Sequence, residues 1–242
     1  MKFSSYKILS LIDYTTLKPT DSSVDIIHLC KNATTPKGTV AAICILPAFV
    51  ALARQNLVDK AIRIATVAHF PSGEESLQQT LHSITSSLQA GADEIDVVMP
   101  YKKYLQGERN YCRDFIAACK KTCDKKLLKV IIESGELKDS KIIEQAAFDM
   151  CEAGADFVKT STGFTPVGAT PEAAQAILQA LQHYQTKTGK LIGFKASGGI
   201  RTAESAMLYM ELAENIFGPV YLHPNTFRIG ASQLVASLQD EN

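Results

Sequence analysis

Strand-like and helix-like segments alternate along nearly the whole chain, in units of about 25 to 35 residues, a rhythm typical of successive βα units. Each strand-like segment is a short apolar run bounded by turn residues, the pattern of a strand buried in a parallel sheet. The predicted strands, with ends placed to within about 2 to 4 residues, are Ile8–Asp13, Val40–Leu46, Ile64–His69, Glu94–Met99, Leu128–Glu133, Phe157–Thr162, Leu191–Ala196 and Phe227–Gly230. Eight such units favour a closed (β/α)8 barrel, the TIM-barrel fold.

Nothing in the composition divides the chain into separate units. It has 242 residues, of which 46% are hydrophobic, and it contains no Gly/Ser-rich or Pro-rich linker. A chain of this length and composition can bury one large core and matches the size of a single barrel. We therefore expect one domain, residues 1–242.

Some of the predicted helices carry local signals. The run Ser72-Gly73-Glu74-Glu75 fits a capping box ahead of a helix with an apolar face. The run Thr170-Pro171-Glu172 opens another helix, because threonine can cap the first turn and proline suits the first helical position. The spacing of Cys112, Cys119 and Cys123 predicts that one helix buries these thiols on a single face.

The charges of the chain cancel, since 25 basic and 25 acidic side chains give a formal net charge of zero. Without a Lys/Arg block, the chain lacks the concentrated positive charge that nucleic-acid backbones require, so small molecules are the expected partners. The run from Met1 to Lys7 has no apolar signal core, and no apolar run approaches the roughly 20 residues of a membrane span. We therefore expect a cytoplasmic protein with neither a nucleic-acid nor a membrane partner.

The six cysteines and five histidines show none of the spacings typical of a metal site or of a disulfide framework. The cysteines are therefore expected to be reduced thiols. With no H-E-x-x-H or similar motif, we predict neither a metal nor another cofactor, although a site assembled from distant residues stays open at this stage.

Two lysines, Lys159 and Lys195, each close a short apolar run and are followed by a turn of small residues. An amine at the carboxyl end of a buried strand faces a site rather than bulk water. Beside a second cation in a low-dielectric place, a lysine loses its proton more readily than its ordinary pKa of about 10.4 allows, and it becomes a nucleophile. One such lysine alone would more often extend toward solvent. The pair instead indicates Schiff-base chemistry.

Asp96 occupies the same place in its segment that Lys159 holds in another. The runs Ala90-Gly91-Ala92-Asp93-Glu94-Ile95-Asp96 and Ala153-Gly154-Ala155-Asp156-Phe157-Val158-Lys159 share a helix-ending glycine and the same offset to a charged residue. On the fourth and sixth strands, the two side chains should lie at similar heights, because alternate strands fill the same layer of a barrel. Asp96 is then a proton-transfer partner, a charge partner for the buried lysines, or both.

Asp13 ends the first predicted strand, at the carboxyl rim where barrel enzymes keep their catalytic groups. Aspartate also readily caps a following turn or helix. On the sequence alone, a structural role and a functional role for Asp13 are equally open.

Glycine-bearing turns follow the last two predicted strands, at Ser197-Gly198-Gly199 and at Gly230-Ala231-Ser232. Glycine lets the backbone approach an anion closely, and barrels often hold phosphate at this place. A glycine pair is more often only a tight turn, but its position after Lys195 and its recurrence one strand later favour a phosphate site. Arg201 would add positive charge there, unless it forms a surface ion pair.

Together these motifs resemble the 2-deoxyribose-5-phosphate aldolase family over nearly the whole chain. The segments that carry the resemblance are Leu11-Ile12-Asp13-Tyr14-Thr15-Thr16-Leu17, Ala42-Ile43-Cys44, Glu94-Ile95-Asp96-Val97-Val98, Lys129-Val130-Ile131-Ile132-Glu133-Ser134-Gly135-Glu136-Leu137, Lys159-Thr160-Ser161-Thr162-Gly163 and Lys195-Ala196-Ser197-Gly198-Gly199-Ile200-Arg201. The resemblance implies a (β/α)8 barrel and a class I aldolase. Such an enzyme reversibly cleaves 2-deoxy-D-ribose 5-phosphate to D-glyceraldehyde 3-phosphate and acetaldehyde through a lysine Schiff base.

The resemblance also implies the catalytic roles. Lys159 would form the imine, Lys195 would depress the pKa of Lys159, and Asp96 would take part in a proton relay through water. Imine chemistry of this kind requires no metal and no other cofactor.

The same resemblance implies the binding residues. Asp13, with Thr15 and Thr160, would bind or orient the substrate. The residues around the phosphate would be Gly163, Gly198, Gly199, Gly230 and Ser232. The expected partners are sugar phosphates and aldehydes, and a homodimer is expected by analogy with similar barrels.

Two departures from the family pattern bear on binding and proton transfer rather than on the imine. Phe164 stands where some relatives carry a phosphate-facing lysine, and the chain ends Gln239-Asp240-Glu241-Asn242 without the terminal tyrosine tail of some members. We expect these departures to affect phosphate affinity and the proton-transfer rate, not the reaction type. Cys44 matches a family position near the site, but it is given no catalytic role because imine chemistry needs no thiol.

Two other functions stay open from the residues themselves. One is another class I aldolase or a transaldolase-like enzyme, with the same imine but a different donor. The other is a barrel that only binds a sugar phosphate, with its lysines serving as anion ligands. Borohydride trapping of acetaldehyde on Lys159 would distinguish the deoxyribose-phosphate aldolase from an aldolase with a different donor. Full turnover of a Lys159→Leu variant would favour the barrel that only binds a sugar phosphate.

Overall fold

Eight parallel strands close into a barrel in the computed structural model, which describes residues 2–240 apart from the side chain of residue 240. Around the barrel the hydrogen-bonded neighbours run β1, β10, β9, β8, β7, β6, β5 and β4, and β4 pairs with β1. Their bounds are β1 Ile12–Thr15, β4 Ala42–Ile45, β5 Arg63–Ala68, β6 Glu94–Val98, β7 Leu127–Ile131, β8 Phe157–Lys159, β9 Gly193–Ser197 and β10 Phe227–Ala231. This topology confirms the predicted (β/α)8 barrel.

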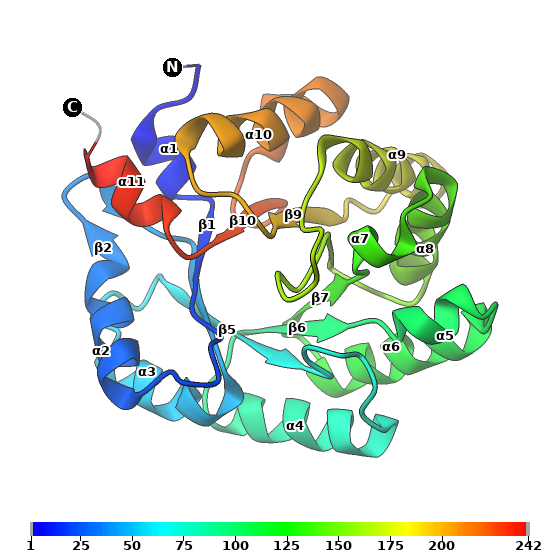
Figure 1. Cartoon of the computed structure of the whole chain (residues 1–242), viewed down its shortest axis with the longest axis horizontal. Coiled ribbons are helices and arrows are strands. Elements are labelled where there is room, and N and C mark those ends of the chain that lie inside the picture. Colours follow the sequence, from blue (N-terminus) through cyan, green and yellow to red (C-terminus); the bar gives the residue numbers. More distant parts are fainter. Residues whose placement is uncertain (1, 241–242) are drawn as a thin grey trace.

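Helices surround the ring of strands, and the two ends of the chain emerge on the same side of the view in Figure 1. The helices are α1 Ser5–Leu9, α2 Ser23–Asn32, α3 Val50–Asn56, α4 Leu77–Gln89, α5 Tyr101–Leu105, α6 Arg109–Cys123, α7 Ser134–Leu137, α8 Ser140–Glu152, α9 Pro171–Thr188, α10 Ala203–Phe217 and α11 Leu234–Asp240, with 3₁₀ turns η1 Pro47–Phe49 and η2 Pro219–Tyr221. A small antiparallel pair, β2 Thr34–Thr35 and β3 Gly38–Thr39, forms a separate sheet. Within the described residues, no helix is both long enough and apolar enough to cross a membrane.

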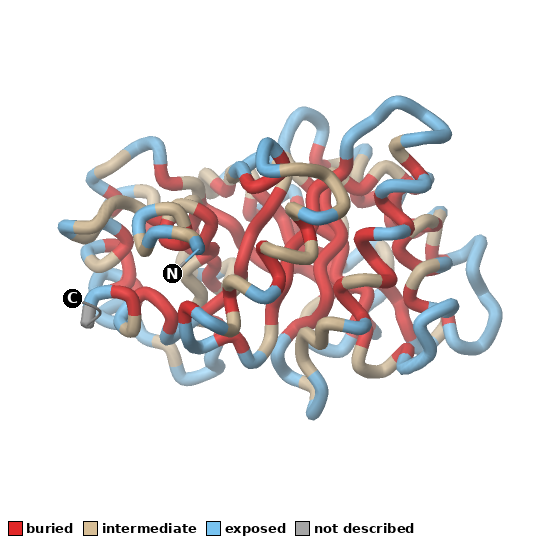
Figure 2. Tube along the Cα trace, turned by 90° about the horizontal axis from the view of Figure 1, so that it is seen from above, coloured by how far each residue is buried: buried red, intermediate tan, exposed pale blue. Residues whose placement is uncertain are grey.

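The barrel strands are buried on both faces, because helices cover the outside and side chains fill the inside. All four residues of β4, Ala42–Ile45, have no exposed surface. Figure 2 shows the same for the central strands, with the exposed residues gathered on the outer helices and loops. A charged side chain on the inner face of such a strand therefore depends on the other side chains inside the barrel for its partners.

The first strand begins later than the sequence predicts. Residues Ser5–Leu9 form the short helix α1, so Ile8 and Leu9 are helical rather than extended. The Ser4 hydroxyl accepts the N–H of Lys7 and caps this helix. Ile8 and Leu9 are buried all the same, and a short apolar run does not distinguish a buried strand from a buried helix. The start of this strand lies at the limit of the stated margin, and the other seven strands also agree with their predicted ends within it.

The capping box of α4 lies four residues later than predicted. Ser76, not Ser72, caps the helix: its hydroxyl accepts the N–H of Gln79, and the Gln79 side chain accepts the N–H of Ser76. The predicted run fails because Gly73 has a left-handed backbone, with φ 67°, so it belongs to the preceding turn. At α9 the prediction is confirmed, since Thr170 caps the helix and Pro171 is its first residue.

The predicted thiol face is confirmed in α6. Cys112, Cys119 and Cys123 all have no exposed surface, and burial raises the pKa of each thiol to about 12. All six cysteines of the chain are free and buried. These thiols therefore act as small apolar side chains of the core.

Candidate active site

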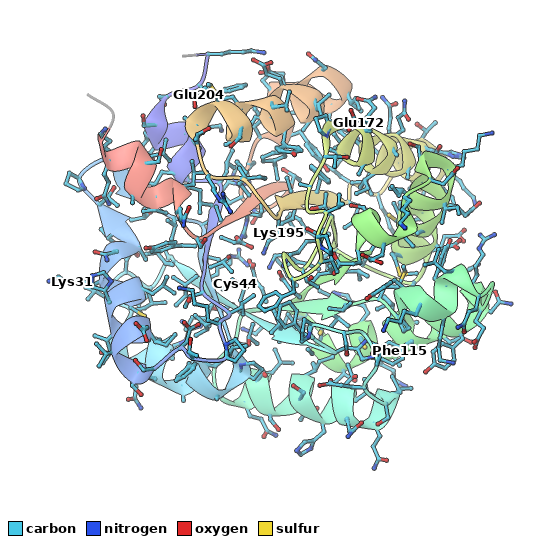
Figure 3. The ribbon with its side chains drawn as sticks, viewed as in Figure 1. Lys31, Cys44, Phe115, Glu172, Lys195 and Glu204 are labelled. Atoms are coloured by element: carbon cyan, nitrogen blue, oxygen red, sulfur yellow. The ribbon has the colours of Figure 1, made fainter. Side chains whose placement is uncertain are left out.

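The inner face of the barrel carries seven charged side chains in one buried network. Three are carboxylates and four are basic groups: Asp13, Glu94, Asp96, Lys129, Lys159, Lys195 and Arg228. Their side chains are between 0% and 3% exposed. Figure 3 shows Lys195 within the ring of strands, whereas the charged residues Lys31, Glu172 and Glu204 lie on the outer helices. Burial of this many charges is tolerated only because each has an opposite partner at hydrogen-bond distance.

The three predicted catalytic residues meet at one carboxylate oxygen. Lys159 at the end of β8 and Lys195 in β9 each place Nζ 2.8 Å from Oδ2 of Asp96 in β6. Lys159 and Lys195 are register partners on neighbouring strands, so both side chains point into the barrel. The predicted common height of Asp96 and Lys159 is therefore confirmed.

The three lysines of the network differ in how many carboxylates surround them. Lys129 Nζ lies within ion-pair distance of three carboxylates, and Lys195 Nζ within that distance of two. In the described part of the chain, Lys159 forms an ion pair with Asp96 alone. Lys159 is thus the least compensated amine of the network.

This difference in surroundings sets the direction of each pKa. Burial lowers the pKa of Lys159, the Asp96 carboxylate opposes this change, and the positive charge of Lys195 lowers the pKa further. Burial alone would also lower the pKa of Lys195, but the carboxylates of Asp13 and Asp96 raise it above its ordinary value. Lys159 therefore loses a proton more readily than a free lysine, while Lys195 stays protonated.

The charge balance of the network favours the same outcome. With every group ionised, four positive charges face three negative charges. Arg63, which is 43% exposed, adds a further positive group 3.6 Å from Glu94. In a medium of low dielectric constant, release of one proton from an amine relieves this excess, and Arg228 does not deprotonate in proteins. Lys159 is the amine placed to release it.

An open cavity of about 490 Å³ lies at the mouth of the barrel and reaches Lys159. Its lining brings together residues predicted from four separate segments: Thr15, Lys159, Gly163, Gly198, Gly199, Gly230 and Ser232. The cavity thus brings Lys159 together with all five residues predicted around a phosphate.

The glycine turns lie against one another at this mouth. A Cβ on Gly163 would lie 4.0 Å from Cα of Gly198, and both residues have left-handed backbones, with φ 82° and 96°. Arg201 and Lys18 also line the cavity and bring positive charge to it, alongside the acidic residues Asp21 and Asp25. Close backbone approach together with nearby positive charge is suited to an anion.

Four predicted site residues do not line the cavity, namely Asp13, Asp96, Thr160 and Lys195. Asp13 is not at the rim as expected. It is the second residue of β1, because the strand continues to Thr15, and its side chain is fully buried. Its Oδ2 accepts from Lys195 at 2.5 Å and its Oδ1 from Arg228 at 2.5 Å. Burial alone would raise the pKa of Asp13, but the cations around it hold that pKa well below its ordinary value.

Thr160 is occupied in joining two strands. Its hydroxyl donates to the carbonyl oxygen of Ser197 at 2.9 Å and accepts the N–H of Ser197 at 2.9 Å. Thr15 lines the cavity, with its hydroxyl donating to the carbonyl oxygen of Asp13. Of the predicted substrate-binding residues, the structure therefore brings only Thr15 to the cavity.

The departures from the family pattern also lie near the mouth. Phe164 is 50% exposed, lines the cavity, and meets the ring of Phe70 edge to face, with centroids 5.2 Å apart. Cys44 on β4 is fully buried, and burial raises the pKa of its thiol. Of the carboxyl-terminal run considered above, residues 241–242 lie outside the described residues.

Sequence reasoning assigned no role to four charged residues of this region. Lys129 and Arg228 interrupt the apolar runs of β7 and β10, and Glu94 lies two residues before Asp96 and so on the same face. Glu133 follows β7 and is fully buried. Lys129 and Arg228 also interrupt apolar runs, but neither is followed by a turn of small residues as Lys159 and Lys195 are, so the pattern did not single them out.

The arrangement does not resemble a metal centre. Within residues 2–240, no three His, Cys, Asp or Glu side chains are grouped so as to hold a metal ion. The cavity is lined instead by an amine of lowered pKa, Lys159, with a carboxylate 2.8 Å away. Together the fold and the site define a barrel enzyme of the Schiff-base class.

The chain belongs to the DeoC/LacD family of aldolases, whose family model matches residues 7–234. It is therefore an aldolase, and the resemblance noted from the sequence is confirmed.

Solved structures agree with this membership. A candidate deoxyribose-phosphate aldolase from Toxoplasma gondii ME49 has a TM-score of 0.88 and 25% identity, over 98% of this chain and 92% of that chain. A second, from Coccidioides immitis, has a TM-score of 0.85 and 28% identity, over 98% and 87%. A deoxyribose phosphate aldolase from Aeropyrum pernix, described as tetrameric, has a TM-score of 0.77 and 26% identity, over 98% and 93%.

Proposed function

We propose that this aldolase reversibly cleaves 2-deoxy-D-ribose 5-phosphate to D-glyceraldehyde 3-phosphate and acetaldehyde through a Schiff base on Lys159. One observation carries the proposal: within the described network, Lys159 is the amine that both lines the cavity and has a lowered pKa. Substrate can reach this nitrogen, which in its neutral form is a nucleophile.

The dimensions of the cavity support a small phosphorylated sugar. Lys159 lines one part of it, and the glycine turns with Arg201 line another. An aldehyde carbon and a phosphate at opposite ends of a five-carbon chain would meet these two regions together. The names of the solved neighbours point to the same substrate.

The first chemical step is imine formation. Neutral Lys159 adds to the C1 aldehyde carbon, and loss of water gives a protonated imine. Protonated Lys195 stays beside it, held by Asp13 and Asp96. The positive imine is then an electron sink, so the chemistry proceeds with the side chains of the chain alone.

The second step breaks the C2–C3 bond, because acetaldehyde takes two carbons and the phosphorylated product takes three. A base removes the proton of the C3 hydroxyl, the C2–C3 electron pair moves toward the imine, and D-glyceraldehyde 3-phosphate leaves. Protonation of the remaining enamine at C2 and hydrolysis of the imine release acetaldehyde. We assign the proton relay, through water, to Asp96, whose Oδ2 faces both amines.

The remaining predicted residues keep subsidiary roles in this proposal. Asp13 keeps Lys195 protonated and so acts on the imine site through that residue. Thr15 contacts substrate in the cavity, and Thr160 fixes β8 against β9. The five residues proposed to surround the phosphate are Gly163, Gly198, Gly199, Gly230 and Ser232.

The test is mass mapping after borohydride reduction in the presence of acetaldehyde. We expect a two-carbon unit on Lys159 and no adduct in Lys159→Leu. Trapping only with a ketone phosphate would instead support a transaldolase-like donor. Full turnover by Lys159→Leu would show that Lys159 does not form the imine, and would favour the alternative in which the lysines only bind the sugar phosphate.

We also propose that the chain assembles as a homodimer, since twofold dimers are the commonest oligomers of folded chains. Sedimentation equilibrium would test this. A tetramer, as described for the Aeropyrum pernix neighbour, would contradict it.

We place the protein in the cytoplasm. The support is its six free cysteines, because disulfides are rare in reducing compartments and common in secreted proteins. Cell fractionation with an antibody to the chain would test the location, and recovery from a secreted fraction would contradict it.

A further inference from the structure

A buried carboxylate that the proposed reaction does not use lies next to the cavity. Glu133 follows β7 and precedes α7, and its side chain is fully buried. Its backbone is left-handed, with φ 51° and ψ 58°, which is uncommon for a residue other than glycine. Backbone conformations of this kind persist only where the surrounding structure holds them in place.

The carboxylate of Glu133 binds the loop between β8 and α9. Its two oxygens lie 3.2 and 3.3 Å from the backbone nitrogen of Thr162, and the Thr165 hydroxyl donates to it at 3.0 Å. Both partners flank Gly163 and Phe164, which line the cavity. Glu133 therefore holds each side of the short segment that faces the substrate.

The other edge of this loop is held by β9. Ser197 donates its hydroxyl proton to the carbonyl oxygen of Ser161 at 2.6 Å. The peptide between Ser161 and Thr162 is thus fixed at both ends, with its carbonyl toward β9 and its N–H toward Glu133. A peptide held in this way cannot rotate without losing one of the two contacts.

Gly135, two residues after Glu133, allows the loop between β8 and α9 to pack closely against α7. A Cβ on Gly135 would overlap the carbonyl oxygen of Val167, so the turn after β7 packs directly against the loop. Glu133 and Gly135 therefore form one side of a clamp, and Ser197 and Gly198 form the other, since Ala169 donates its N–H to Gly198. In this clamp the Glu133 side chain is the charged group.

We infer that Glu133 is a positioning residue that holds residues 162–165 for the phosphate end of the substrate. The inference deepens the proposed function and rests on it. Loss of the carboxylate would free the Thr162 N–H and the Thr165 hydroxyl, so that Gly163 no longer keeps its place beside Gly198. Binding of the phosphorylated sugar would then weaken, while Lys159, on the strand itself, would keep its partners.

The decisive variant is Glu133→Gln, which keeps the shape but replaces an acceptor oxygen by an amide donor. We expect kcat/KM for 2-deoxyribose 5-phosphate to fall about tenfold, the size of one lost hydrogen bond to a charged group, mainly through KM. With unphosphorylated 2-deoxyribose the change should be much smaller. Borohydride trapping of acetaldehyde should keep its wild-type rate.

A readout independent of turnover is hydrogen exchange. Amides of residues 162–165 should exchange faster in Glu133→Gln than in the wild type, whereas amides of β8 should not change. Glu136→Gln, the same substitution three residues later in α7, is the matched control and should resemble the wild type in both measurements.

A second pair of variants, at Thr165, tests the same inference if Glu133→Gln does not fold. Thr165→Val removes one of the donors to Glu133 and should shift the substrate preference in the same direction by a smaller factor, whereas Thr165→Ser should restore it. Unchanged exchange in residues 162–165, or an equal loss with both sugars, would overturn the inference. Failure of the proposed function would look different, because the wild type itself would then give no acetaldehyde adduct on Lys159.

Discussion

Lys159 and Lys195 share one carboxylate oxygen, Oδ2 of Asp96, which lies 2.8 Å from each Nζ. The two amines are nevertheless unequal, because Lys195 also contacts Asp13. The additional carboxylate raises the pKa of Lys195, while burial and the neighbouring cation lower the pKa of Lys159. One carboxylate thus connects an amine that stays charged with an amine that can react.

In the wild type, we expect imine formation to accelerate as pH rises through the lowered pKa of Lys159, since only the neutral amine adds to an aldehyde. The rate of borohydride trapping with acetaldehyde should therefore reach its plateau below the pH at which a free lysine titrates. NMR titration of the Lys159 side chain measures the pKa of the same amine directly. A side chain that stays fully protonated well into alkaline solution, with Lys195 intact, would contradict the mechanism.

Lys195→Met should move that pH profile upward. Removal of the positive neighbour leaves Asp96 to stabilise the charged form of Lys159 alone, and a nearby charge shifts a pKa by about 1–3 units. The pH dependence of trapping measures the shift. Lys190→Met removes an exposed lysine ahead of the same strand and should leave the profile unchanged. Equal profiles for Lys195→Met and the wild type would show that the neighbouring charge does not tune Lys159.

Asp13→Asn should destabilise the fold, because it leaves Lys195 and Arg228 buried with one carboxylate fewer. Loss of one partner of a buried ion pair typically costs about 3–5 kcal/mol, measurable by urea unfolding at neutral pH. Asp139→Asn, which changes the cap of α8, is the control and should leave the stability nearly unchanged, because asparagine and aspartate cap a helix about equally well.

The stability difference between the wild type and Asp13→Asn should depend on pH in a defined direction. The folded-state pKa of Asp13 lies below its ordinary value, so its contribution is complete above the unfolded-state pKa of about 3.9 and is lost as pH falls through the folded-state pKa. The two unfolding free energies should therefore converge in strong acid. A constant difference down to the lowest pH at which both fold would count against this account.

Gly230→Ala should disturb catalysis through Lys195. An added Cβ would lie 2.8 Å from Cβ of Ser197 and 3.2 Å from Cε of Lys195, so the lysine must shift. Overpacking of this kind costs about 1–3 kcal/mol, and we expect kcat to fall as Lys195 moves from Asp96. Gly199→Ala, where an added Cβ meets nothing within 4 Å, should spare kcat, although it puts a side chain on a left-handed backbone with φ 86°, unlike Gly230→Ala. An unchanged kcat in Gly230→Ala would contradict the expected displacement.

Much of the site could be predicted from the sequence. In a barrel, the position of a residue along its strand sets both its height along the barrel axis and whether its side chain points inward. Lys159 and Asp96 could be paired from matching segments alone, and the glycine turns could be placed at the mouth. Asp13 was expected at the rim because the predicted strand stopped at this residue, whereas the observed strand continues to Thr15, and sequence patterns place strand ends only to within about 2 to 4 residues.

The sequence by itself determined the alternation that produces the barrel, the lysines at its strand ends and the glycines at its mouth, since these depend on patterns within a few residues of one another. Only the tertiary structure decided which of these lysines has a lowered pKa. Asp13, Lys129, Glu133 and Arg228 come from distant segments, and their effect on Lys159 and its loop depends on distances of a few ångströms that closure of the barrel sets. Charge interactions in a buried site fall steeply with distance and with access to water, and spacing along a chain specifies neither.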